Sequence, residues 1–304
     1  MASISDKEIM ERLQINRQIL DMFKKVQKDA LLEVKRLDAA KRKRKKITVL
    51  GISGSARDAF DMAREDSNSE ELLERCLKRC KELGAQTELI ALRKYKIGYC
   101  KACYSTANTQ CHFYCSCYPK NTPAGDDMTN TLYDKIISAD AIIFATPVNN
   151  FKISTLLATF LDRCISLDGS LGPANPRNPK DRELNIKHMK FVEMTADNEK
   201  PGSGMIRRFN GKVAGAIVTG HEAGAGMVIS NLFMTLNHFG MIFPPFNNVY
   251  AMASICQSTY EDKKELLEGC YEDELKALAD NVMLAAKLTK KTSFKDWKYD
   301  YSKN

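Results

Sequence analysis

The chain of 304 residues contains no uninterrupted apolar run as long as the roughly 18 residues that cross a bilayer. The charge-free stretch over residues 223–260 is punctuated by Gly, Pro and Asn, so it predicts a buried helix, a turn and a strand. The N-terminus lacks the apolar core of a secretory signal, because Asp6, Glu8 and Glu11 interrupt it. We therefore expect no membrane span and a cytoplasmic protein.

Histidine is scarce, with 4 residues, whereas cysteine is not, with 10. Without a secretion signal, clustered thiols more often bind metal than pair as disulfides. Apolar residues at 44% and charged residues at 28% lie near the globular average, which excludes wholesale disorder, collagen and a disulfide-stapled miniprotein. The length suits one large domain or two small ones.

The excess of positive charge is confined to one end of the chain. Residues 1–46 contribute +7 of the net charge of +8, with 14 Lys and Arg against 7 Asp and Glu. The remaining residues carry 32 cations against 31 carboxylates. A neutral body argues against a nucleic-acid groove, so nucleic acid is an unlikely partner.

Residues 1–46 predict a single amphipathic helix with a basic end. Ser5 and Glu8 fit a capping box, and apolar residues recur every three or four positions from Ile15 to Leu37. Such a stripe predicts packing against the chain's own body or a second subunit. The cations at 41–46 fit either a solvated helix end or a contact with phosphates of nucleic acid or anionic lipid.

Short apolar runs then alternate with helical stretches over residues 47–260, and a helix with an aromatic tail follows over 261–304. This alternation predicts an α/β fold with a doubly wound, five-stranded parallel sheet. Two stretches interrupt the rhythm: 98–128, which holds half of the cysteines, and 168–210, which is an insertion rich in Pro, Gly and Asn. The predicted strands are 47–53, 87–92, 141–145, 212–219 and 248–252, and the predicted helices are 67–83, 129–139, 154–167, one that ends near Gly240, and 261–290.

Ligands of an open parallel sheet bind beyond the carboxyl ends of its strands. After the first predicted strand comes Gly51-Ile52-Ser53-Gly54-Ser55-Ala56-Arg57, and Ser67-Asn68-Ser69 then opens a helix. Small residues let backbone N–H groups approach an anion, hydroxyls and an Arg add hydrogen bonds, and the helix N-terminus adds a favourable dipole. The loop matches neither the Rossmann nor the Walker pattern, so by itself it indicates an anion site of another kind or only a turn.

The loop resembles the phosphate loop of the NADPH-dependent FMN reductase and iron-sulfur flavoprotein family. The resemblance covers about half of the chain and implies a flavodoxin-like fold that binds FMN. It continues through Cys100-Lys101-Ala102-Cys103, Asp126-Asp127-Met128, Ala139-Asp140-Ala141-Ile142-Ile143-Phe144-Ala145-Thr146-Pro147-Val148, the segments 211–213 and 216–220, and His238-Phe239-Gly240-Met241.

The same resemblance assigns three groups of residues to FMN. The implied phosphate contacts are Ser53, Ser55, Arg57, Asn68 and Ser69, the residues implied to line the flavin ring are Pro147, Val148, Asn149 and Asn150, and those implied to close the other side of the ring are Thr219, Gly220 and His221. His221 is also a candidate proton or hydrogen-bond donor at the flavin, the alternative being an ordinary loop histidine.

Five cysteines, Cys100, Cys103, Cys111, Cys115 and Cys117, fall in one loop after the second strand. Four thiolates suffice for zinc or for an iron–sulfur cluster, and uncoordinated thiols are the third alternative. The resemblance implies a [4Fe-4S] cluster held by four of these five, although Thr106 stands where the family has a third ligand. His112 is a less favoured ligand, and Cys76 and Cys80 lie on an apolar helix stripe that predicts core packing.

These expectations combine into an FMN-dependent oxidoreductase. It would pass electrons from NAD(P)H or a reduced protein donor through FMN to an acceptor, with a ferredoxin-type protein as a possible partner. The N-terminal stripe and the family resemblance also predict a homo-oligomer, a dimer or a tetramer. The alternatives are a flavin electron carrier without turnover and a redox-sensing binding protein.

Overall fold

A computed structural model describes residues 4–58, 60, 62, 64, 66–103, 111–221, 224–253 and 271–298. Its centre is a parallel sheet of five strands in the order β2-β1-β3-β4-β5, which confirms the predicted doubly wound α/β fold. Continuous Val, Ile, Leu and Ala runs form the inner strands because helices cover both of their faces. The strands are β1 (Thr48–Ser53), β2 (Gln86–Ala91), β3 (Ala141–Pro147), β4 (Val213–His221) and β5 (Asn248–Ala253).

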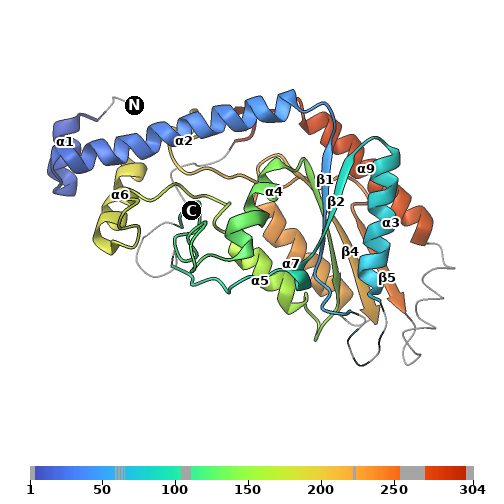
Figure 1. Cartoon of the computed structure of the whole chain (residues 1–304). Coiled ribbons are helices and arrows are strands. Elements are labelled where there is room, and N and C mark those ends of the chain that lie inside the picture. The colour runs from blue at the N-terminus through green and yellow to red at the C-terminus, as the bar shows by residue number, and fades with distance from the viewer. Residues whose placement is uncertain are drawn as a thin grey trace.

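Helices cover the two faces of the sheet in separate groups (Figure 1). One face packs against α4 (Tyr133–Ser138), α5 (Thr155–Cys164) and α7 (Ala225–His238). The other packs against α3 (Asn68–Glu82) and α9 (Tyr271–Thr289). Cys76 and Cys80 are fully buried in this second layer, as the sequence predicts. Short helical turns η1 (Leu92–Lys94), η2 (Met128–Leu132) and η3 (Phe294–Asp296) complete the described elements.

The N-terminal segment forms two helices, α1 (Asp6–Leu13) and α2 (Arg17–Lys43), so the prediction of a single helix is wrong. The break lies at Gln14, whose φ of 50° is left-handed and stops α1. Asn16 then caps α2, because its side-chain oxygen accepts the Ile19 N–H at 3.0 Å. Ser5 caps α1 by accepting the Glu8 N–H at 3.2 Å, as expected.

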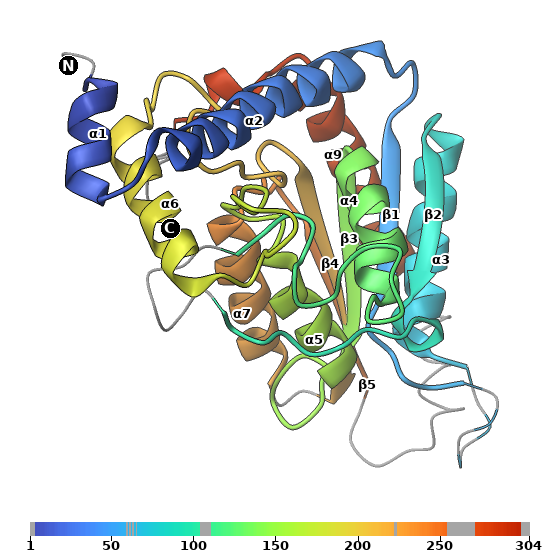
Figure 2. The same ribbon diagram turned by 60° about the vertical axis from the view of Figure 1, so that its left-hand side comes forward.

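The insertion at 168–210 contains a helix that the sequence analysis does not anticipate, α6 (Arg182–Thr195). It packs with α1 and α2 into a separate apolar cluster that includes Phe23, Phe191 and Val192 (Figure 2). The apolar stripe of α2 is therefore covered by the chain itself. This removes the stripe as an argument for a second subunit.

The two ends of the sheet carry different features. The loops that follow β1, β3 and β4 gather at the carboxyl ends of the strands, whereas α2 runs past their amino ends (Figure 1). None of the described helices has both the length and the apolar character that a bilayer crossing requires.

Candidate functional site

The loop after β1 leads into α3 through a short hydroxyl cluster. Ser67 caps α3 by accepting the Glu70 N–H at 3.3 Å, and its Oγ lies 3.1 Å from Ser69 Oγ. Ser55 Oγ accepts the Arg57 N–H at 3.2 Å, which tightens the start of the loop. The predicted phosphate residues therefore lie around the N-terminus of α3, where the helix dipole favours an anion.

Two of these side chains bury polar atoms that the described protein residues leave unpaired. Asn68 Oδ1 is buried and has no hydrogen-bond partner within the described part of the chain. Ser53 Oγ is fully buried beside the Glu70 carboxylate and forms no well-aligned hydrogen bond there. An unpaired buried polar group costs about 1–3 kcal/mol, so a ligand with ribityl hydroxyls and phosphate oxygens suits this lining. These residues fit FMN.

Glu70 does not repel an anion at this helix N-terminus, because Arg93 neutralises it. The guanidinium makes a two-pronged contact with the carboxylate at 2.5 and 2.8 Å. Burial has the largest effect and raises the pKa of Glu70, but the hydrogen bonds and positive charges around it, those of Arg93 foremost, together outweigh burial, so the net pKa is lowered. Glu70 thus stays ionised and paired with Arg93.

The segment after β3 is a tight hairpin-like turn. Asn149 and Lys152 exchange backbone hydrogen bonds of 2.9 and 3.1 Å across Asn150 and Phe151. Both of these central residues have positive φ, 49° and 63°, which is the pattern of a type I′ turn. Asn149 and Asn150 are exposed at the edge where the resemblance places the flavin ring.

The turn after β4 packs directly on the turn after β3. Val148 N–H donates to Thr219 O at 2.8 Å. Gly220 has a φ of 153°, and a Cβ there would lie 3.1 Å from Val148 Cβ. A Cβ on Gly224 would lie only 2.8 Å from Phe151 Cα, so both glycines permit the close approach. The structure thus brings the two predicted ring-lining segments together.

His221 ends β4, and its side chain lies outside the described residues. Its suggested role as a donor at the flavin therefore stays a prediction. Arg57 is described and half-buried beside the loop, with a polar interaction of its own.

A groove of about 1120 Å³ runs between α5 and α7 from the β3 turn. At its far end Asp168 lies 3.0 Å from Arg207 and 3.5 Å from His238 Nε2. Burial raises the pKa of Asp168 to about 6, with Arg207 opposing the shift. Phe151 and Cys111 both line the groove, so it connects the edge of the flavin site with the cysteine loop.

A buried ion pair holds the cysteine loop on the sheet. Arg163 of α5 and Asp126 have side chains only 1% and 5% exposed, and they pair directly. Arg163 also donates to Gly98 O at 2.8 Å, and Asp126 accepts the Gly98 N–H at 2.9 Å. The Tyr118 ring stacks on the guanidinium at 4.1 Å, so both ends of the loop contact this one pair.

Arg163 is the residue that the sequence analysis misses. The available signal is an Arg in the mostly apolar helix at 154–167, where Asp162 is the only other charged residue, because a charge in such a place is normally paired. Asp126 belongs to a motif that the resemblance does identify.

Four of the five clustered cysteines form a chain of thiol contacts, in the order Cys111, Cys103, Cys117, Cys115. Contact with the Cys111 thiol, together with burial, raises the pKa of Cys103 to about 11. Contact with Cys117 likewise raises the pKa of Cys115. The thiols of Cys103 and Cys115 are therefore protonated at neutral pH when no metal is bound.

Cys100 takes a different contact, because its Sγ accepts the Ala102 N–H at 3.4 Å. Within the described ranges, no three His, Cys, Asp or Glu side chains converge on a point that would hold a single metal ion. Thiols are the ligands that iron–sulfur clusters use, so the residue types suit such a cluster. Their arrangement differs from that of a bound cluster, because the four thiols contact one another in a row. His112 is buried with Nδ1 2.8 Å from Ser116 Oγ, and burial lowers its pKa to about 4.

The strand order β2-β1-β3-β4-β5, with a polar loop at the switch between β1 and β3, defines a flavodoxin-like α/β protein. Within this class, the chain belongs to the NADPH-dependent FMN reductase family, whose model matches residues 47–254. This family comprises flavin-dependent oxidoreductases.

Two curated relatives are iron-sulfur flavoproteins. The one from Archaeoglobus fulgidus is 31% identical over 120 residues, which cover 39% of this chain and 51% of that protein. The one from Methanosarcina thermophila is 28% identical over 119 residues, covering 39% and 53%. The chain thus spans about half the length of the curated relatives it matches.

Among solved structures, the crystal structure of RosB with a bound intermediate superposes with a TM-score of 0.56. It is 16% identical and covers 82% of both chains. At this identity the likeness supports the shared fold.

Proposed function

We propose that this protein is an FMN-dependent oxidoreductase that takes electrons from NAD(P)H or a reduced protein donor and delivers them to an acceptor. The observation that carries the proposal is the buried, unpaired polar lining formed by Ser53 and Asn68 at the N-terminus of α3. Membership of the FMN reductase family gives this lining its chemical meaning.

Each group of residues has a distinct task in the proposed site. Ser55, Arg57 and Ser69 would join Ser53 and Asn68 in holding the phosphate. The exposed β3 turn would supply backbone groups to one edge of the ring, and Thr219 and Gly220 would close the other side. FMN, when bound, supplies two-electron acceptance together with single-electron release.

No dinucleotide fingerprint accompanies the flavin loop, so a nicotinamide donor would reach the flavin from its open side. The groove between α5 and α7 begins at that side, where Phe151 and Lys152 line it. We infer that a donor or acceptor approaches through the mouth of this groove.

We further propose that the cysteine loop holds an iron–sulfur cluster. The name iron-sulfur flavoprotein of two relatives and the contiguity of four thiols support it. The contacts favour Cys103, Cys111, Cys115 and Cys117 as ligands over Cys100. A cluster would require these thiols to lose their protons and to rearrange from a row around a centre.

Anaerobic purification tests whether the protein binds FMN and which donor reduces it. The expected protein shows flavin absorption bands and is reduced by NADPH, NADH or reduced ferredoxin. Slow reduction by both nicotinamides with fast reduction by ferredoxin would identify an electron carrier. A protein that cannot be reconstituted with FMN would refute the flavin proposal.

Iron analysis of matched serine variants tests the cluster separately. Cys117→Ser should lose most of the iron, whereas Cys100→Ser, the same change in the same loop, should keep it. Iron retained by Cys117→Ser would rule out this ligand set. Zinc found in place of iron would show that the loop holds a structural zinc ion and would refute the cluster.

A further inference from the structure

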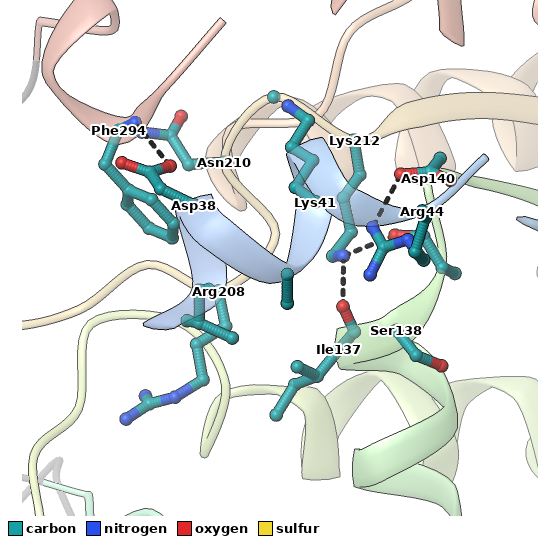
Figure 3. A pocket seen from close by; sticks show the side chains of 14 residues that line it. Asp38, Lys41, Arg44, Ile137, Ser138, Asp140, Arg208, Asn210, Lys212 and Phe294 are labelled. Atoms are coloured by element: carbon teal, nitrogen blue, oxygen red, sulfur yellow. Dashed lines mark hydrogen bonds and ion pairs between the residues drawn. The ribbon is translucent and has the colours of Figure 1, made fainter. Parts of the chain in front are cut away.

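A second cavity lies at the opposite end of the sheet from the flavin loop. It measures about 170 Å³, several times the roughly 30 Å³ that a water molecule occupies in the liquid. The last turns of α2, the end of α4 and the turn at 208–212 enclose it, and Figure 3 shows the side chains of the residues that line it. No residue of the predicted flavin site lines this cavity.

Cations outnumber carboxylates in the lining. Lys41, Arg44, Arg208 and Lys212 face only Asp38 and Asp140 there. Arg208 is paired with Glu33 at 2.7 Å, and Arg44 with Asp140 at 2.7 Å. Among the described residues, the ammonium groups of Lys41 and Lys212 have no carboxylate within 4.0 Å, although Lys41 Nζ lies 3.5 Å from Thr292 Oγ1.

The structure divides the basic run at 41–46 into two groups. Lys41 and Arg44, three residues apart, turn toward the cavity and are half-buried. Arg42, Lys43, Lys45 and Lys46 are exposed. A solvated helix end explains the second group. In the first group Asp140 compensates the burial of Arg44, whereas the ammonium of Lys41 has only the Thr292 hydroxyl at 3.5 Å, and burying a cation costs free energy unless an anion or an acceptor compensates.

Two buried donors of the lining also lack partners. Arg44 Nε and Asn210 Nδ2 are buried and donate to no atom of the described residues. Both belong to residues that line the cavity, and each unpaired buried donor costs about 1–3 kcal/mol. Two donors without partners, beside two ammonium groups that have no carboxylate partner, are complementary to a ligand that only accepts hydrogen bonds.

Lys212 is the deepest cation of the group. Its Nζ donates to Ile137 O at 2.8 Å and to Ala139 O at 2.5 Å, which leaves a third proton. Burial lowers the pKa of Lys212 to about 7, with Asp140 opposing and Arg44 and Lys41 adding to the shift. A bound anion would favour the charged form of this lysine.

We propose that this cavity binds a small oxyanion of the phosphate type, with Lys41, Arg44, Lys212 and Asn210 as its donors. The ligand is either the free ion or the terminal phosphate of a small phosphomonoester. A bound anion would link the end of α2 to the start of β3 and to the turn before β4.

Calorimetric titration of inorganic phosphate into FMN-saturated protein tests the proposal, since FMN then fills the other anion site. Chloride keeps the ionic strength constant at pH 7. The wild-type protein should give saturable binding, and Lys41→Gln should weaken it at least about tenfold. Lys43→Gln is the matched control, because it removes the same charge from the exposed side of the same helix end, and it should change the affinity less than about twofold.

Asn210→Asp provides a second variant that replaces an unpaired donor with an acceptor, and it should likewise weaken binding at least about tenfold. Titration with glycerol 3-phosphate distinguishes the sources: binding of both ligands indicates a phosphomonoester, and binding of phosphate alone indicates the free ion. Absence of saturable binding in the wild-type protein, or equal losses in Lys41→Gln and Lys43→Gln, would overturn the proposal. The comparison of the two lysine variants holds whether or not FMN occupies the other end of the sheet.

Discussion

Replacing Asp126 by Asn should destabilise the protein and loosen the cysteine loop. The carboxylate faces Arg163, whose side chain is 1% exposed, and both groups contact Gly98 at the beginning of the loop. The substitution leaves the buried guanidinium without its counter-charge, which costs about 3–5 kcal/mol. At about 2 °C per kcal/mol for a chain of this size, the melting temperature should fall by about 6–10 °C.

Urea unfolding at pH 7 measures this loss, and the rate of thiol modification reports on the loop. Asp134→Asn is the matched control, because Asp134 also pairs with this region, through Lys120 at 2.6 Å, but is 49% exposed. The control should lose less than about 1 kcal/mol. Equal losses in the two variants would refute the anchoring role of the buried pair.

The same pair makes a pH prediction with a definite sign. Burial has the largest effect and raises the pKa of Asp126, but the hydrogen bond and charge of Arg163, together with the hydrogen bonds from the Gly98 and Thr129 N–H groups, outweigh burial and lower the net pKa. A lowered carboxyl pKa contributes stability that is present above the unfolded value near 3.8 and is lost as the pH falls through the folded value. The stability difference between wild type and Asp126→Asn should therefore shrink in acid.

Three further predictions concern other parts of the molecule. Asn68→Ala should weaken FMN binding about tenfold in a fluorescence titration, since it removes one polar contact, and unchanged affinity would exclude Asn68 from the site. Between about pH 7 and 10 the folded wild type binds fewer protons than the unfolded chain, so its free energy of unfolding should rise by up to about 1.4 kcal/mol per pH unit. Lys212→Met should flatten this rise. Equal slopes in urea unfolding at pH 7, 8 and 9 would contradict the lowered lysine pKa. Gly220→Ala should lower the melting temperature by a few degrees, because its Cβ would press on Val148, and an unchanged melting temperature would show that the turn adapts.

The sheet was predictable because its strands are continuous apolar runs and its helices carry clear caps. Ser67, for example, caps α3 as expected, and β1 and β3 lie within about two residues of their predicted limits. The helix break at Gln14 escaped prediction because apolar positions continue on both sides of it. Asn16 was the available signal, since it is a strong N-cap residue.

Helix α6 was missed because prolines and charges surround it. Asp181 caps it, and Leu184, His188 and Phe191 give it a helical stripe that the composition of the insertion conceals. The contacts among the thiols could not be predicted, because the described residues of the cysteine loop form little regular structure that would fix their spacing. Likewise, the sequence shows a basic run but not which of its cations turn inward.

The direct test of an FMN site at the N-terminus of α3 is the flavin content of the protein purified under reducing conditions. Released cofactor, identified and quantified after denaturation, should be FMN at close to one molecule per chain. The bound flavin should bleach when NAD(P)H or reduced ferredoxin is added without oxygen. A colourless protein that neither retains nor rebinds FMN would contradict the proposed function.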